Sequence, residues 1–96
     1  MNREKILELL RQYKEDNLDK YGILAMGIFG SVARDEAKEN SDVDVCIRTK
    51  MPDMFSIIHI KEDLQTLFSA KVDIIRVREK MNPFLKKRIE KDAIYV

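Results

Sequence analysis

The sequence predicts a single α/β domain spanning residues 1–96. Apolar patterns typical of helices and of short buried strands alternate along the chain. A chain of 96 residues can bury one modest core but not two, and no repeat, low-complexity segment or linker divides it. Alternating helices and buried strands form layers around one core, which is the α/β architecture.

The first half of the chain predicts a helix, a strand and a short helix. Apolar residues recur at helical spacing from residue 3, and Gly22 ends this helix. Residues 23–30, "ILAMGIFG", form a nearly continuous apolar run, which favours a buried strand. We expect Ser31 to be the N-cap or first residue of a short helix over residues 31–37, followed by a polar loop over residues 38–41.

The second half predicts strand, helix, strand and helix. Residues 42–48 form the second strand, and Pro52 then breaks the chain. Residues 53–70 form a helix with Asp53 as its cap, and residues 71–77 form the third strand. A last helix covers residues 82–93, with Asn82 as cap and Pro83 at its first position.

Composition sets limits on the partners and the compartment. The chain has 18 Lys and Arg against 17 Asp and Glu, a net charge of +1, so we do not expect direct binding to nucleic acid or to a membrane surface. No apolar run approaches the roughly 20 residues of a membrane span, and the polar N-terminus does not predict a signal peptide. The one cysteine, Cys46, fits a reducing cytoplasm and is expected to be a small buried strand residue.

Three aspartates mark a candidate metal site. Side chains alternate across a strand, so Asp42 and Asp44 point to the same face, with Cα atoms roughly 7 Å apart. Asp73 interrupts the apolar third strand, and it joins them at one end of the sheet if the second and third strands pair. Clustered carboxylates repel one another, and divalent cations remove that cost. Oxygen ligands suit Mg²⁺ or Mn²⁺, and such ions serve phosphoryl transfer.

Gly30 and Ser31 mark a candidate phosphate-binding loop. They stand where a strand ends and a helix begins, so backbone N–H groups and a hydroxyl can face an anion. Glycine allows a close approach because it has no Cβ. Arg34, one turn further on, is placed to bind the same phosphates with its guanidinium group.

Each feature also has a purely structural interpretation. Gly30 and Ser31 can form an ordinary capped turn, and residues 41–44 a turn that enters an edge strand. Asp73 can pair with Lys71 or Arg76, and Arg34 with Asp35 or Glu39. The joint occurrence of these features, in this order and on these elements, favours the functional interpretation.

The stretch "GSVARDEAKENSDVDV" resembles the signature of the DNA polymerase β-like nucleotidyltransferases, and the brevity of the chain resembles their minimal (MNT) members. The resemblance covers residue 24 to about residue 77. It implies a mixed β-sheet backed by helices, the palm fold of that superfamily. It also implies that Gly30 and Ser31 bind the nucleotide phosphates. Arg34 matches an arginine of the family's "GSxAR" start, whereas Asp35 stands where many members have glycine.

The same resemblance implies roles for the acids and for a partner. Asp42 and Asp44 become metal ligands, and Asp73 becomes the third carboxylate, which activates the attacking hydroxyl. MNT proteins commonly pair with a HEPN ribonuclease toxin in type VII toxin–antitoxin systems. The resemblance therefore implies Mg²⁺-dependent transfer of AMP from ATP to a toxin hydroxyl, expected to be a tyrosine, within a hetero-oligomer.

Two other functions remain open from the sequence. One is an antitoxin that binds its toxin without catalysis, and the other is a nucleotidyltransferase acting on a small molecule or on RNA. The sequence does not fix the acceptor or the nucleotide preference. The candidate apolar residues for docking of a partner are Phe55, Ile58, Phe68 and Phe84, and the sequence is equally consistent with a place in the core for each of them.

Overall fold

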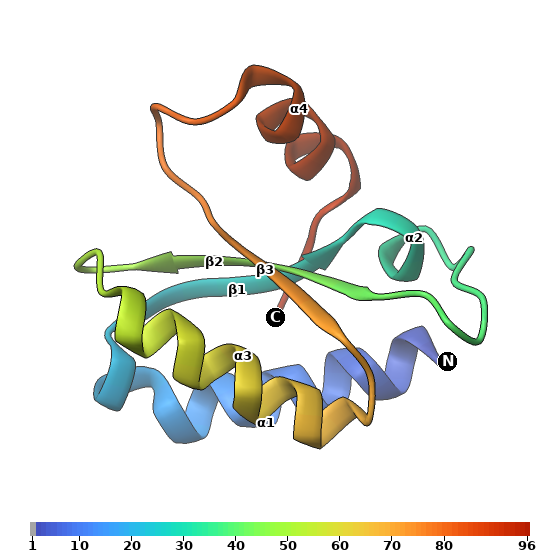
Figure 1. The fold of residues 1–96 in the computed structure, drawn as a ribbon, viewed down its shortest axis with the longest axis horizontal. Helices are drawn as coiled ribbons and strands as arrows, with labels where there is room; N and C mark the ends of the chain where they lie inside the picture. Colours follow the sequence, from blue (N-terminus) through green and yellow to red (C-terminus); the bar gives the residue numbers. More distant parts are fainter. Residues whose placement is uncertain (1) are drawn as a thin grey trace.

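The computed structural model describes residues 2–96, which form four helices and four strands. Their order along the chain alternates helix and strand throughout, as Figure 1 shows. The elements are α1 (Arg3–Tyr21), β1 (Ile23–Phe29), α2 (Gly30–Ala33), β2 (Val43–Thr49), α3 (Met54–Phe68), β3 (Val72–Arg76), α4 (Pro83–Asp92) and β4 (Ile94–Tyr95).

The four strands form one mixed sheet in the order β3-β2-β1-β4. β1 pairs antiparallel with both β2 and β4, whereas β2 and β3 run parallel. The parallel pair is connected through α3, as a parallel connection requires a long crossover. A mixed sheet backed by helices is the architecture that the resemblance implied, and the structure confirms it.

Local capping explains where the helices begin and end. The side chain of Asn2 accepts a hydrogen bond from the Lys5 N–H at the start of α1, and Gly22 closes α1 in the left-handed conformation at φ 62°. Asp53 caps α3, and Asn82 caps α4 with Pro83 at the first turn, as predicted.

The helices cover the two faces of the sheet unequally. Figure 1 shows α1 and α3 packed side by side on one face, while α4 crosses the other. The larger core lies under α1 and α3 and includes Val43, Val45 and Ile47, so these residues point to the face opposite that of Asp42 and Asp44. The smaller core under α4 is formed by Phe29, Cys46 and Ile89. Cys46 is buried, as predicted.

Three details differ from the prediction. The short helix α2 ends at Ala33 rather than at residue 37, because Asp35 turns the chain at φ 59°. Phe29 is its N-cap, so Ser31 is neither the cap nor the first residue. The two-residue strand β4 was not predicted. Among the predicted docking residues, Phe55, Ile58 and Phe84 are exposed, but Phe68 packs against the larger core.

Within residues 2–96, no helix has both the length and the apolar character needed to cross a membrane.

Candidate active site

The parallel pairing of β2 and β3 sets the acids side by side. Asp44 and Asp73 are partners in the register of these two strands. The antiparallel pairing of β1 with β2 places Phe29 opposite Asp44 on its other side. Gly30, the residue after Phe29, therefore begins α2 next to the Asp44 carboxylate. This register brings the start of α2 next to Asp44 and Asp73.

Gly30 and Asp44 are in close contact. A Cβ atom built on Gly30 would overlap with the Oδ2 atom of Asp44. The backbone of Gly30 has a φ of 71°, a conformation that residues with a side chain rarely adopt. Gly30 is buried and Ser31 is partly buried. The first N–H groups of a helix have no partner within the helix, so those of α2 remain available to an anion. A helix of one turn has only a small dipole, however, so the N–H groups themselves must provide the attraction.

The charge environment of Asp44 is mixed. Partial burial raises the pKa of its carboxyl group above the usual range, and the nearby carboxylates of Asp73 and Asp42 raise it further. Arg88 and Arg34 oppose this shift. A raised pKa means that the surroundings of Asp44 disfavour its charged form. A bound cation would stabilise that charged form.

The donor set fits a divalent cation in its chemistry, because Asp44, Asp73 and Asp42 supply carboxylate oxygens. Asp42 and Asp73 are exposed and Asp44 is partly buried. In the part of the chain that the structure describes, no three acidic, histidine or cysteine side chains are gathered closely enough to hold a metal ion. The assignment of all three acids as metal ligands thus stays a prediction, and substrate oxygens would have to complete the coordination.

Arg34 binds two carboxylates. Its Nη1 atom donates to Asp92 Oδ2 at 2.6 Å, and its Nε atom donates to Glu36 Oε2 at 3.2 Å. Asp92 is on α4 with a side chain only 8% exposed, whereas Glu36 is 66% exposed. The structural interpretation of Arg34 anticipated a carboxylate partner, but Asp35 and Glu39 were the wrong ones. Its role toward phosphates stays a prediction.

Two further arginines of this region were not predicted. Arg3, on α1, donates from Nη1 to the carbonyl of Ala33 at 3.0 Å and so holds the end of α2. Arg88, on α4, is close enough to Asp44 to influence its pKa. Both come from helices distant in sequence, and no local pattern distinguishes them from exposed basic residues.

Comparisons with known proteins agree on one family. The family model of the nucleotidyltransferase domain matches residues 10–96. MJ1217 of Methanocaldococcus jannaschii, a candidate protein adenylyltransferase, is 40% identical over 93 residues, which cover 96% of this chain and 95% of that protein. The protein adenylyltransferase MntA of Thermococcus cleftensis is 30% identical over 94 residues, which cover 97% and 94%.

Solved structures share the fold. A candidate minimal nucleotidyltransferase matches with a TM-score of 0.78 and 27% identity, covering 98% of this chain and 95% of that one. The complex of a tri-AMPylated Shewanella oneidensis HEPN toxin with its MNT antitoxin matches with a TM-score of 0.64 and 20% identity, covering 98% and 67%. At 20% identity the likeness shows the fold alone. Together with the match over residues 10–96, the nearly full-length relatives show that this chain belongs to the nucleotidyltransferase domain family and is a nucleotidyltransferase.

Proposed function

We propose that this chain transfers AMP from ATP to a hydroxyl group of a HEPN toxin and thereby acts as its antitoxin. The observation that carries the proposal is the register of Asp44 with Asp73 beside the glycine that begins α2. The relatives support the choice of reaction, since MntA of T. cleftensis is a protein adenylyltransferase. The S. oneidensis complex supports the choice of partner, since it joins an MNT antitoxin to an AMPylated HEPN toxin.

In this proposal, the loop residues bind ATP and an acid activates the acceptor. The N–H groups at Gly30 and Ser31, with the Ser31 hydroxyl, bind the phosphates of ATP. Asp73 accepts the proton of the attacking hydroxyl. Asp42, Asp44 and Asp73 would hold Mg²⁺ or Mn²⁺ together with substrate oxygens, and such an ion would supply positive charge to the phosphate oxygens and to the attacking hydroxyl.

The reaction balances without any other reactant. The acceptor oxygen forms a bond to the α-phosphorus of ATP, while the bond from that phosphorus to the bridging oxygen of pyrophosphate breaks. The electron pair leaves with pyrophosphate, and the hydroxyl proton passes to Asp73. The products are an AMP ester of the acceptor and pyrophosphate.

A docked protein can reach these acids directly. Asp42 and Asp73 are exposed, and strand alternation puts Asp73, like its register partner Asp44, on the same face of the sheet as Cys46, which packs against α4. A tyrosine of the toxin is the proposed acceptor, by resemblance to the family. The added AMP brings a negative charge and a bulky base, and both would obstruct RNA at a ribonuclease site.

Intact-mass spectrometry of the toxin after incubation with the chain, Mg²⁺ and ATP tests the proposal. The wild-type chain should add one or more adenylate increments, whereas Asp44→Asn and Asp73→Asn should add none. Asp19→Asn removes an exposed carboxylate from the end of α1 and should retain full transfer.

The same experiment separates the other two functions. An unchanged toxin mass combined with blocked ribonuclease activity would show that the chain inhibits the toxin by binding alone, without transfer of AMP. Transfer of label from ATP to RNA or to a small molecule, with none to the toxin, would show that the acceptor is not a protein.

A further inference from the structure

The outer edge of β3 is open. β3 is the last strand on its side of the sheet. The carbonyl of Lys71 accepts a hydrogen bond from β2 at 2.9 Å, and the N–H of Val77 donates one to β2 at 2.8 Å. Because backbone groups of successive residues point in opposite directions across a strand, Val72, Ile74 and Arg76 direct their N–H and C=O groups away from β2.

Only the first of these residues has a partner for its outward N–H group. The Val72 N–H donates to the Gln65 side-chain oxygen at 3.2 Å. For Ile74 and Arg76, the remainder of the described chain supplies no hydrogen-bond partner to the outward backbone groups. Unpaired groups along a strand edge are a template for pairing with another chain.

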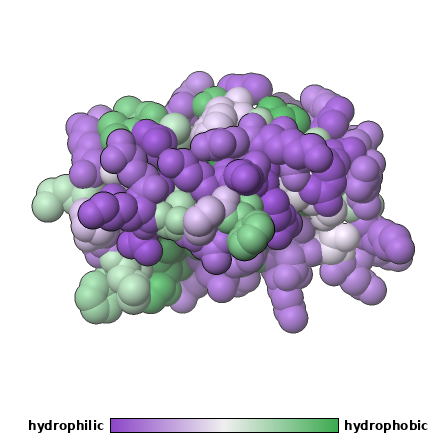
Figure 2. Space-filling model, turned by 90° about the horizontal axis from the view of Figure 1, so that it is seen from above, coloured by the Kyte–Doolittle hydropathy of each residue, from purple (hydrophilic) through white to green (hydrophobic). Residues whose placement is uncertain are grey.

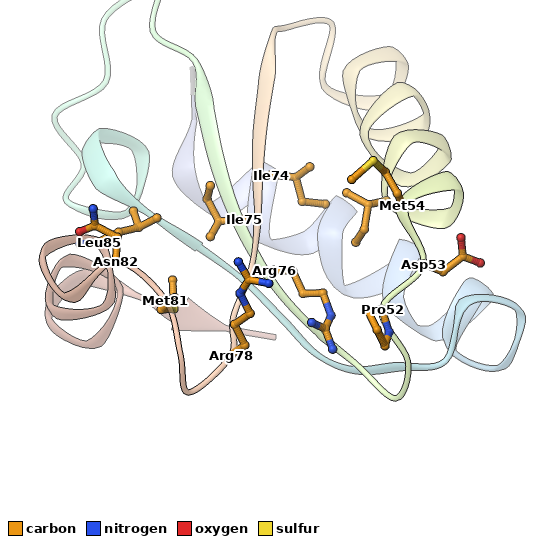
Figure 3. Close-up of a pocket in the computed structure, with 11 residues that line it drawn as sticks. Pro52, Asp53, Met54, Ile74, Ile75, Arg76, Arg78, Met81, Asn82 and Leu85 are labelled. Carbon is orange, nitrogen blue, oxygen red and sulfur yellow. Dashed lines mark hydrogen bonds between the residues drawn. The ribbon is translucent and has the colours of Figure 1, made fainter.

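An apolar groove follows this open edge. It has a volume of about 590 Å³ and lies between the start of α3 and the segment that leads into α4. Figure 3 shows Met54 and Ile74 on one side of the strand and Met81 and Leu85 on the other. The apolar lining residues are Met54, Ile57, Ile74, Ile75, Met81 and Leu85. Figure 2 shows apolar surface gathered at the lower left, at the end of the molecule where α3 begins.

The groove carries positive charge. Arg76 and Arg78 line it, and neither has a carboxylate within 4 Å in the described part of the chain. The Nε atom of Arg76 donates to Thr49 Oγ1 at 3.0 Å, which fixes the position of its guanidinium group. The one acid in the lining, Asp53, accepts hydrogen bonds from Phe55 and Ser56 at the start of α3. The occupant best suited to this groove is therefore apolar and acidic.

We propose that an extended segment of a partner protein pairs with the open edge of β3 and adds a strand to the sheet. Its backbone bonds to Ile74 and Arg76, alternate side chains enter the groove, and a carboxylate pairs with Arg76 or Arg78. A second copy of this chain fits less well. Antiparallel pairing of two β3 strands about Ile74 would place Arg76 of each copy opposite Val72 of the other, so a second copy would offer Arg76 no carboxylate on the same face.

The probe for this inference is a phage library of random twelve-residue peptides selected on the immobilised chain. Enrichment should favour peptides with apolar residues at alternate positions and at least one Asp or Glu. Ile74→Pro removes the outward N–H group without removing a hydrogen bond to β2, and it should weaken binding at least tenfold. Arg78→Glu should do the same through charge, and it serves if the proline variant fails to fold.

Arg11→Glu is the matched control, because it makes the same charge change on the exposed surface of α1. It should bind the enriched peptides as the wild type does. Equal binding by Ile74→Pro and Arg78→Glu, or no enrichment of the alternating pattern, would overturn the proposal.

Amide exchange measured by NMR locates the bound peptide. A synthetic peptide of the enriched sequence should slow exchange of the Ile74 and Arg76 amides at least tenfold, while the Val72 amide, already bonded to Gln65, changes little. Protection confined to other elements would contradict strand addition. So would wild-type dimerisation in sedimentation that Ile74→Pro abolishes, since the occupant would then be a second copy.

Discussion

Gly30 and Asp44 lie against each other so closely that no Cβ atom fits between them. The register of β1 with β2 creates this contact, because it pairs Phe29 with Asp44 and α2 begins at the next residue. The sequence predicted that glycine makes room for a phosphate. In the structure its first effect is to make room for an acid of the site, which couples the loop to Asp44.

Gly30→Ala should therefore disable the site and not only strain the backbone. The positive φ alone costs about 1–3 kcal/mol of stability, and the added methyl group must also displace the Asp44 carboxylate. Thermal unfolding and titration with ATP measure the two effects. Gly22→Ala is the control, since Gly22 also has a positive φ but its Cβ would meet only Lys50 at 3.6 Å. ATP binding by Gly30→Ala equal to that of Gly22→Ala would contradict the coupling.

Asp35→Gly should stabilise the chain. Asp35 turns the chain after α2 at φ 59°. This left-handed conformation costs a residue other than glycine about 1 kcal/mol. Glycine adopts it freely, although its greater freedom in the unfolded chain reduces the gain. Chemical denaturation should show a higher midpoint with an unchanged slope. A lower midpoint would mean that the exposed Asp35 side chain contributes more than its backbone strain costs.

The local elements of the fold were predictable because their signals are local. Asp53 and the pair Asn82 and Pro83 set the starts of α3 and α4 through bonds to the next residues. The end of α2 was not predicted, because this chain has aspartate at position 35, where the glycine of many family members would signal a positive φ. β4 is only two residues long, and it depends on a close approach of the Ile94 carbonyl to Gly27.

The site was predictable in its residue types and only partly in its geometry. Alternation along a strand put Asp42 and Asp44 on one face, but the pairing of Asp44 with Asp73 required a register that no local pattern determines. Arg88 could not be predicted as a neighbour of Asp44, because α4 reaches this face only in the folded chain. The Asp92 partner of Arg34 escaped prediction for the same reason.

The ion pair of Arg34 with Asp92 should hold α2 against α4. A double-mutant cycle with Arg34→Ala and Asp92→Asn should give a larger coupling in stability than the cycle with Arg34→Ala and Glu36→Gln. The reason is that Asp92 is nearly buried at 2.6 Å whereas Glu36 is exposed at 3.2 Å, and exposed pairs contribute little. Equal coupling in the two cycles would show that the buried carboxylate does not tie these helices together.

Tyr13→Phe should lower stability in a pH-dependent way. The Tyr13 hydroxyl donates to Asp63 Oδ2 at 2.7 Å and ties α1 to α3. Burial, and then this hydrogen bond, raises the pKa of Tyr13 above its usual range. The contribution of about 1 kcal/mol is therefore fully present below the unfolded pKa of about 10 and is lost as pH rises above it. Denaturation of both proteins between pH 7 and 11 tests this, with Tyr21→Phe on the same helix as control.

Asp44→Asn should keep or raise the stability of the metal-free chain and should lose most of the stabilisation by Mg²⁺ and ATP. In the absence of divalent cations, the variant removes a partly buried carboxylate that lies beside Asp73 and Asp42, so its melting temperature should equal or exceed that of the wild type. With Mg²⁺ and ATP at ten times their apparent dissociation constant, the wild type should gain about 1.4 kcal/mol, and most of this gain should vanish in the variant. Asp19→Asn, on α1, should keep the full gain. Scanning calorimetry that gives equal shifts for the wild type and Asp44→Asn would remove Asp44 from the metal site, whatever the outcome for transfer.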